Sequence, residues 1–82
     1  MSPKEFSKTL GNNVRARRAS LSLSQSDLAD LAGVSERFVR FVEQGKATVQ
    51  LEPLLAVLST LGLELTVQPT LTNPANTRST RP

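Results

Sequence analysis

The chain has 82 residues, with ten Lys and Arg against seven Asp and Glu, and it contains no Cys, His, Trp or Tyr. Its length suits one domain with a small core. The lack of Cys excludes disulfides, and without His or Cys a metal site would need carboxylates alone. Because His, the commonest acid–base side chain, is also missing, we expect no cofactor, no metal and no enzymatic activity.

The chain carries no signal for a membrane. No apolar run approaches the ~20 residues needed to cross a bilayer. Residues 1–5 lack the apolar stretch and cleavage site of a signal peptide. We therefore expect a cytoplasmic protein that makes no membrane contact.

The first predicted helix runs from Pro3 to about Ser20. Phe6, Leu10 and Val14 follow one another at steps of four residues, which places them on one helical face. Pro3 is acceptable in a first turn, where its missing N–H would be unbonded in any case. We expect packing, rather than helix propensity, to hold this helix together.

Two short helices are predicted next. Ser24 is a good N-cap for a helix over 25–32, and Gly33 follows where a left-handed residue is wanted. Ser35 caps a second helix over 36–44, which Gly45 stops, and Val39 and Val42, three residues apart, should face the core. A pair of short helices joined by a tight glycine-containing turn is typical of a helix-turn-helix.

The second half of the chain predicts a helix, a strand and a tail. An apolar helix over 51–61 ends at Gly62, and residues 63–67 alternate apolar and polar as a short strand does. Residues 69–82 are rich in Pro and Thr and nearly free of apolar side chains, so we expect a disordered tail after a domain of residues 1–68.

A lone strand leaves its backbone groups unpaired. The simplest remedy is antiparallel pairing with the same strand of a second subunit about a two-fold axis. Leu63, Leu65 and Val67 would then form the apolar face of a dimer strand. The alternative is an extended tail that packs on its own domain. The expected fold is mainly α, with four or five helices and one short C-terminal β-strand that pairs across a dimer.

The order of residues over 24–35, SQSDLADLAGVS, resembles the phage-repressor and Cro-type (XRE) helix-turn-helix family. The likeness continues through Val39, Val42, Glu43 and Lys46 and covers about residues 10–62. Residues 51–67 further resemble HipB-like antitoxins, in which a strand follows the last helix and joins the dimer.

In such a domain the second helix lies in the major groove and reads base edges with its N-terminal residues. Here these are Ser35, Glu36, Arg37 and Arg40, and the resemblance adds Gln25. Arg37 and Arg40 share a face, and Arg can bond two acceptors of guanine, so we expect a G in each half-site. Glu36 could accept from cytosine or could orient Arg40.

Other residues of the motif are expected to hold the DNA backbone or the fold. The expected phosphate contacts come from Arg15, Ser24, Gln44, Lys46 and Thr48. The resemblance implies that Arg18 and Glu43 form an internal salt bridge.

The chain departs from the family at three positions. Ser22 stands where Gly is usual, so it is strained if the turn needs a positive φ. Phe38 and Phe41 replace short polar residues. They could contact thymine methyl groups, form a patch for a partner protein, or, as we favour for Phe38, belong to the core.

The expected function is a dimeric, sequence-specific transcriptional repressor that binds double-stranded DNA at an inverted-repeat operator. The resemblance further suggests the antitoxin of a HipBA-like toxin–antitoxin operon, which represses its own operon and binds a HipA-type kinase toxin. Two alternatives remain: a Cro/repressor-type regulator unrelated to a toxin, and a protein-interaction module that does not bind DNA.

Overall fold

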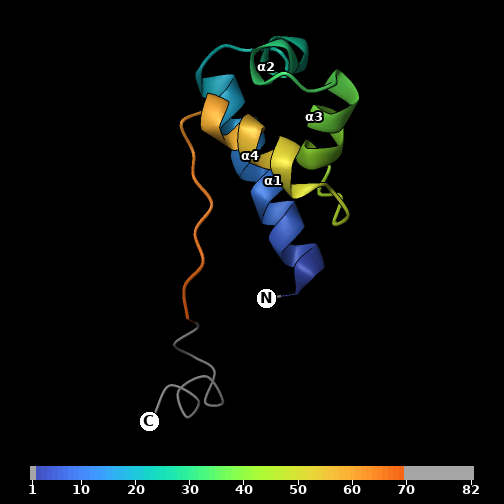
Figure 1. Ribbon diagram of the computed structural model, residues 1–82, viewed down its shortest axis with the longest axis vertical. Coiled ribbons are helices and arrows are strands. Elements are labelled where there is room, and N and C mark those ends of the chain that lie inside the picture. Colours follow the sequence, from blue (N-terminus) through green and yellow to red (C-terminus); the bar gives the residue numbers. More distant parts are fainter. Residues whose placement is uncertain (1, 70–82) are drawn as a thin grey trace.

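A computed structural model describes residues 2–69 of the chain, and these form a bundle of four helices (Figure 1). The helices are α1 (Pro3–Ser20), α2 (Gln25–Ala32), α3 (Glu36–Glu43) and α4 (Leu51–Thr60). Their bounds agree with the predicted ones to within one residue. The predicted disordered tail lies, but for residue 69, outside the described residues.

Side-chain caps fix where the first three helices begin. Ser2 caps α1 through reciprocal hydrogen bonds with Glu5, and Ser24 caps α2 in the same way with Asp27. The Ser35 hydroxyl accepts from the backbone N–H of Phe38 and begins α3. Each cap satisfies backbone donors that a helix start otherwise leaves unbonded.

The core lies where α1, α3 and α4 converge below α2 (Figure 1). Its fully buried side chains come from every helix or its end: Val14, Leu28, Val39, Val57 and Leu61. Val39 and Val42, predicted to face inward, are buried, as are Leu28 and Ala29 of α2. The apolar periodicity of the sequence therefore identified the buried face of α2 and α3 correctly.

The N-terminal half of α1 departs from this expectation. Val14 is fully buried and Leu10 packs partly against the core, but Phe6 is 47% exposed. Phe6 therefore has the spacing of the apolar face but does not join the core. The first turns of α1 extend past the bundle, and no other helix of the described chain covers them (Figure 1).

Gly11 marks a close contact between α1 and α3. A side chain at this buried position would clash with the carbonyl oxygen of Val42 and would lie 2.9 Å from that of Glu43. Glycine weakens a helix interior by about 1 kcal/mol relative to Ala. Here it allows the C-terminal end of α3 to rest directly on α1.

The predicted strand over 63–67 is not present. The backbone N–H of Leu63 donates to the Leu58 carbonyl at the end of α4, 2.8 Å away. Among the described residues that follow, 64–69, none has regular secondary structure and no backbone hydrogen bond joins them to other described residues. A strand needs a neighbouring strand, and residues 2–69 of one chain supply none.

None of the helices within residues 2–69 has both the length and the apolar character that a membrane span requires. Over the same residues, no cluster of three or more carboxylate side chains is arranged to hold a metal ion.

Candidate nucleic-acid interface

The outer face of α3 carries exposed charged side chains. Glu36, Arg37 and Arg40 are exposed, whereas Val39 and Val42 on the opposite face are buried. Arg37 and Arg40 are three residues apart and so lie on the same side of the helix. Glu36 and Arg40 are one turn apart but form no ion pair, so the interpretation that Glu36 orients Arg40 has no support in the unbound chain.

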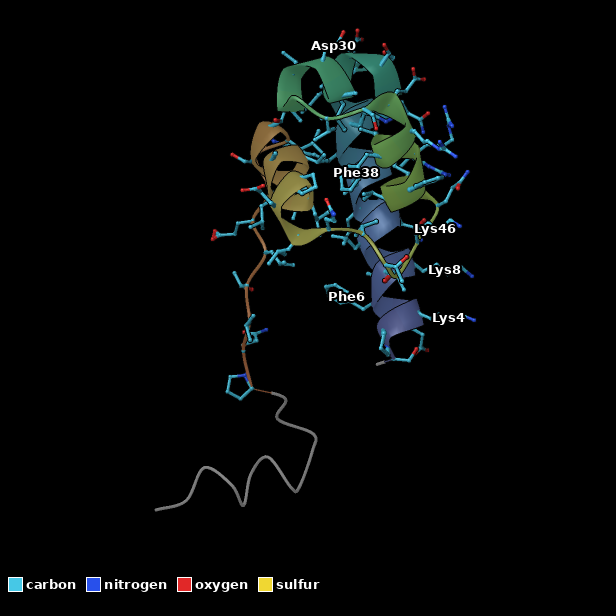
Figure 2. The ribbon with its side chains drawn as sticks, turned by 45° about the vertical axis from the view of Figure 1, so that its right-hand side comes forward. Lys4, Phe6, Lys8, Asp30, Phe38 and Lys46 are labelled. Atoms are coloured by element: carbon cyan, nitrogen blue, oxygen red, sulfur yellow. The ribbon has the colours of Figure 1, made fainter. Side chains whose placement is uncertain are left out.

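The two phenylalanines of α3 have different surroundings. Phe38 is half-buried, packs against the core and points between α1 and α3 (Figure 2). Phe41 lies beneath two cations: the Arg37 guanidinium carbon is 5.4 Å from its ring centre and the Lys46 ammonium nitrogen 5.3 Å. Both distances suit cation–π attraction, so Phe41 helps to hold these two side chains over one surface.

A buried carboxylate fixes α3 against α1. The Glu43 side chain is fully buried. Arg18 donates to both of its oxygens, over 2.6 Å from Nε and 3.0 Å from Nη2. The same guanidinium donates to the Leu23 carbonyl, 2.9 Å away, in the connection between α1 and α2. This is the ion pair that the family resemblance implied, and one arginine thereby joins three parts of the domain.

The ionisation of Glu43 depends on these partners. Burial raises the pKa of the Glu43 carboxyl, but hydrogen bonds from Arg18 and Gln25 and the nearby arginine charges outweigh burial, so the pKa is lower than usual. The hydrogen bond to Glu43 raises the pKa of Arg18 in turn. Both groups are therefore charged at neutral pH, so the positive charge of Arg18 neutralises the buried carboxylate of Glu43.

Gln25 and Arg15 were expected to contact DNA, yet both lie at this internal carboxylate. The Gln25 side-chain amide donates to Glu43 Oε1 over 3.1 Å. Arg15 Nε lies 3.6 Å from the same oxygen, although its side chain is 58% exposed. In the unbound chain Gln25 therefore serves the fold, while Arg15 keeps most of its surface open to a partner.

The other residues expected at a phosphate backbone lie on the surface around α3. Gln44 closes the end of α3, and Lys46 and Thr48 are exposed in the loop that follows. The Ser24 and Ser35 hydroxyls already accept backbone hydrogen bonds as helix caps. Both serines are exposed at the starts of α2 and α3.

Two features of the site region concern residues whose roles the sequence did not settle. Arg17 donates from Nε to the Leu61 carbonyl over 2.8 Å and so joins α1 to the end of α4. Ser22 has a φ of 59°, the one positive value among the described residues other than glycine. The strain expected where the family has Gly is therefore present.

Comparison with known proteins agrees with this geometry. A family model described as Helix-turn-helix matches residues 14–68. An uncharacterized HTH-type transcriptional regulator of Sinorhizobium fredii is 41% identical over 58 residues, which cover 71% of this chain and 76% of the relative. Another, of Haemophilus influenzae, is 38% identical over 52 residues, which cover 63% of this chain and 53% of the relative. Since the family model matches more than half of the chain, the protein belongs to the helix-turn-helix family.

Proposed function

We propose that the protein is a sequence-specific DNA-binding repressor that acts as a dimer, with residues 1–68 as its working domain. One observation carries the proposal: Arg37 and Arg40 extend from the exposed face of α3, while the opposite face of the same helix is buried in the core. The names of the two relatives, both HTH-type transcriptional regulators, also support it.

In this proposal α3 enters the major groove. Arg37 and Arg40 each donate two hydrogen bonds to guanine, and Glu36 and Ser35 contact neighbouring base edges. Gln44, Lys46 and Thr48, with Arg15 and the capped start of α2 at Ser24, hold the phosphates on either side. Gln25 reaches DNA only by giving up its hydrogen bond to Glu43.

The dimer is proposed to form through the extended segment after α4. Leu65 is partly exposed and Val67 is 98% exposed. Leu65 shares an apolar hollow with Phe6 and Leu51, whose side chains are also exposed. Antiparallel pairing of Leu63, Leu65 and Val67 with their counterparts in a second copy would satisfy the free backbone groups and cover these side chains.

A more specific role rests on the resemblance of residues 51–67 to HipB-like antitoxins: a protein that represses its own operon and binds a HipA-type kinase toxin. A pull-down with the product of a neighbouring kinase-like gene tests this role. Failure to capture that kinase, with DNA binding intact, would leave a general Cro/repressor-type regulator.

The decisive experiment selects duplexes from a random pool with the purified protein and measures their binding by gel shift. We expect an inverted repeat with G in each half-site and half-sites about one helical turn apart or a multiple of it. Arg37→Ala should relax the preference for G at one position of each half-site. If no sequence is enriched, the protein-interaction module becomes the better account and the proposal fails.

The dimer has its own test, the molar mass in solution measured by light scattering. The wild-type chain should have twice the monomer mass. Leu65→Lys, which places a charge in the apolar hollow, should shift it toward the monomer. The matched control Thr66→Lys alters a neighbouring polar residue on the opposite face of an extended segment and should leave the mass unchanged. A wild-type monomer at all concentrations would contradict the dimer.

A further inference from the structure

Three cations form a row along one edge of the molecule, beyond the face of α3. Lys46 follows α3, and Lys8 and Lys4 lie on α1, four residues apart and so on the same side of that helix. All three side chains point to the same side of the structure (Figure 2). They are exposed, and Lys4 and Lys8 fall in the part of α1 that precedes the match to the family model.

The row is continuous with the base-reading surface because of two close contacts. The turn at Gly45 packs against the backbone of Lys8, since a side chain on Gly45 would lie 3.2 Å from the Lys8 Cα. This contact brings Lys8 beside Lys46. Lys46 in turn shares the ring of Phe41 with Arg37. The cations therefore lead from the middle of α3 to the first turn of α1.

The charge of this edge is positive after its acidic neighbour is included. Lys4, Lys8 and Glu5 line one hollow together with Gln44 and Gly45. The Glu5 carboxylate accepts from the backbone N–H of Ser2 over 2.9 Å and is held at the helix start. Three lysines against one such carboxylate leave an excess of two positive charges along the row.

We propose that Lys4 and Lys8 extend the protein's contact with DNA by binding additional backbone phosphates, beyond those that the helix-turn-helix itself contacts. The inference rests on the proposed DNA binding. One turn of α1 separates the two lysines by a rise of about 6 Å. A duplex carries one phosphate for every ~3.4 Å of axis along each strand, so both lysines find a phosphate if the duplex follows this edge. Lysine serves such contacts as a point charge and confers no preference for base.

The test measures the salt dependence of binding to a duplex that the wild-type protein selects from a random pool, and to a scrambled duplex of equal length. The double variant Lys4→Gln/Lys8→Gln keeps the side-chain stems and removes both charges. Because a dimer carries four such lysines, its slope of log K against log salt should be shallower by about 3.6, and its affinity should fall by the same factor on both duplexes. Its thermal midpoint should equal that of the wild type.

Two controls separate contact from net charge. Lys4→Arg/Lys8→Arg keeps the charges and should retain the wild-type slope. Ser59→Glu lowers the net charge by one, as Lys8→Gln does, but Ser59 is an exposed residue of α4 and does not belong to the row of lysines. It should change the slope less than Lys8→Gln. A double Gln variant with the wild-type slope overturns this inference alone, whereas a wild-type chain that binds neither duplex overturns the proposed function as well.

Discussion

Arg17 and Arg18 near the end of α1 differ sharply in their surroundings from Arg37 and Arg40 on α3. The first pair is bonded within the protein, to the Leu61 carbonyl and to the buried Glu43 carboxylate. The second pair is exposed and makes no ion pair with any described residue. All four count equally toward the net charge of +3. The comparison teaches that equal charges can have different surroundings: some arginines of this chain are bonded within the fold, and others are exposed without an ion pair among the described residues.

The division has a physical cause. Glu43 is the one charged residue among the described residues that is buried, and a buried carboxylate must be neutralised. Arg18 neutralises it with two hydrogen bonds, one to each carboxylate oxygen. Gln25 and Arg15 both lie near Oε1 of the same carboxylate. Within residues 2–69, no carboxylate lies within ion-pair distance of Arg37 or Arg40, so no described residue neutralises their charges.

Arg18→Ala is expected to have the largest effect of the substitutions that test this comparison. It leaves Glu43 buried without its main partner, so we expect the free energy of unfolding to fall by about 3–5 kcal/mol. Urea denaturation followed by circular dichroism measures the loss. The double variant Arg18→Met/Glu43→Leu should recover part of the stability, because it removes the buried charge as well. A wild-type midpoint for Arg18→Ala would mean that the ion pair does not hold the fold.

The outward pair should show the opposite behaviour. Arg37→Ala and Arg40→Ala should each weaken binding to the selected duplex by about 1–3 kcal/mol and relax the preference for G at one position. Their unfolding midpoints should match the wild type. Arg17→Ala is the matched control, because it removes the same charge from the internal pair. It should cost stability and leave DNA affinity nearly unchanged, and equal losses of affinity in all three variants would refute the division.

Acid should weaken the internal pair with a definite sign. The folded-state pKa of Glu43 lies below its ordinary value of 4.5. Its contribution to stability is therefore complete above about pH 4.5 and is lost as the pH falls through the folded-state pKa. The difference in unfolding free energy between wild type and Glu43→Gln should be constant from pH 7 to pH 5 and shrink below that range. Taking the difference cancels Glu5 and Asp27, whose pKa values are also lowered by their capping hydrogen bonds.

The smallest effect is expected at Phe41. Phe41→Leu removes the ring shared by Arg37 and Lys46, and an exposed cation–π contact contributes about 0.5–1 kcal/mol. We expect DNA affinity to fall by roughly two- to fivefold with stability little changed, as measured by fluorescence anisotropy. Phe41→Tyr, which keeps the ring, should bind like the wild type. A loss as large in Tyr as in Leu would argue against a role for the ring.

The sequence by itself determined the helices and their ends. Ser24, Gly33 and Ser35 act on the backbone within a few residues, so their capping and turning roles could be read directly from the order of residues. The exposure of Arg37 and Arg40 also followed, because helical periodicity sets them opposite the apolar positions Val39 and Val42. The strained turn at Ser22 was anticipated from the same motif.

Only the tertiary structure decided which polar side chains meet one another. Gln25 donates a hydrogen bond to Glu43, and Gly11 allows close packing of α3 against α1. Neither contact could be predicted locally, because each joins residues that are 18 or more positions apart in the sequence. Phe6 has the spacing of a core residue but lies where the bundle ends. Likewise, the alternation of apolar and polar residues over 63–67 specifies which side chains share a face. A strand forms only when another strand pairs with it, and the local sequence does not encode that second strand.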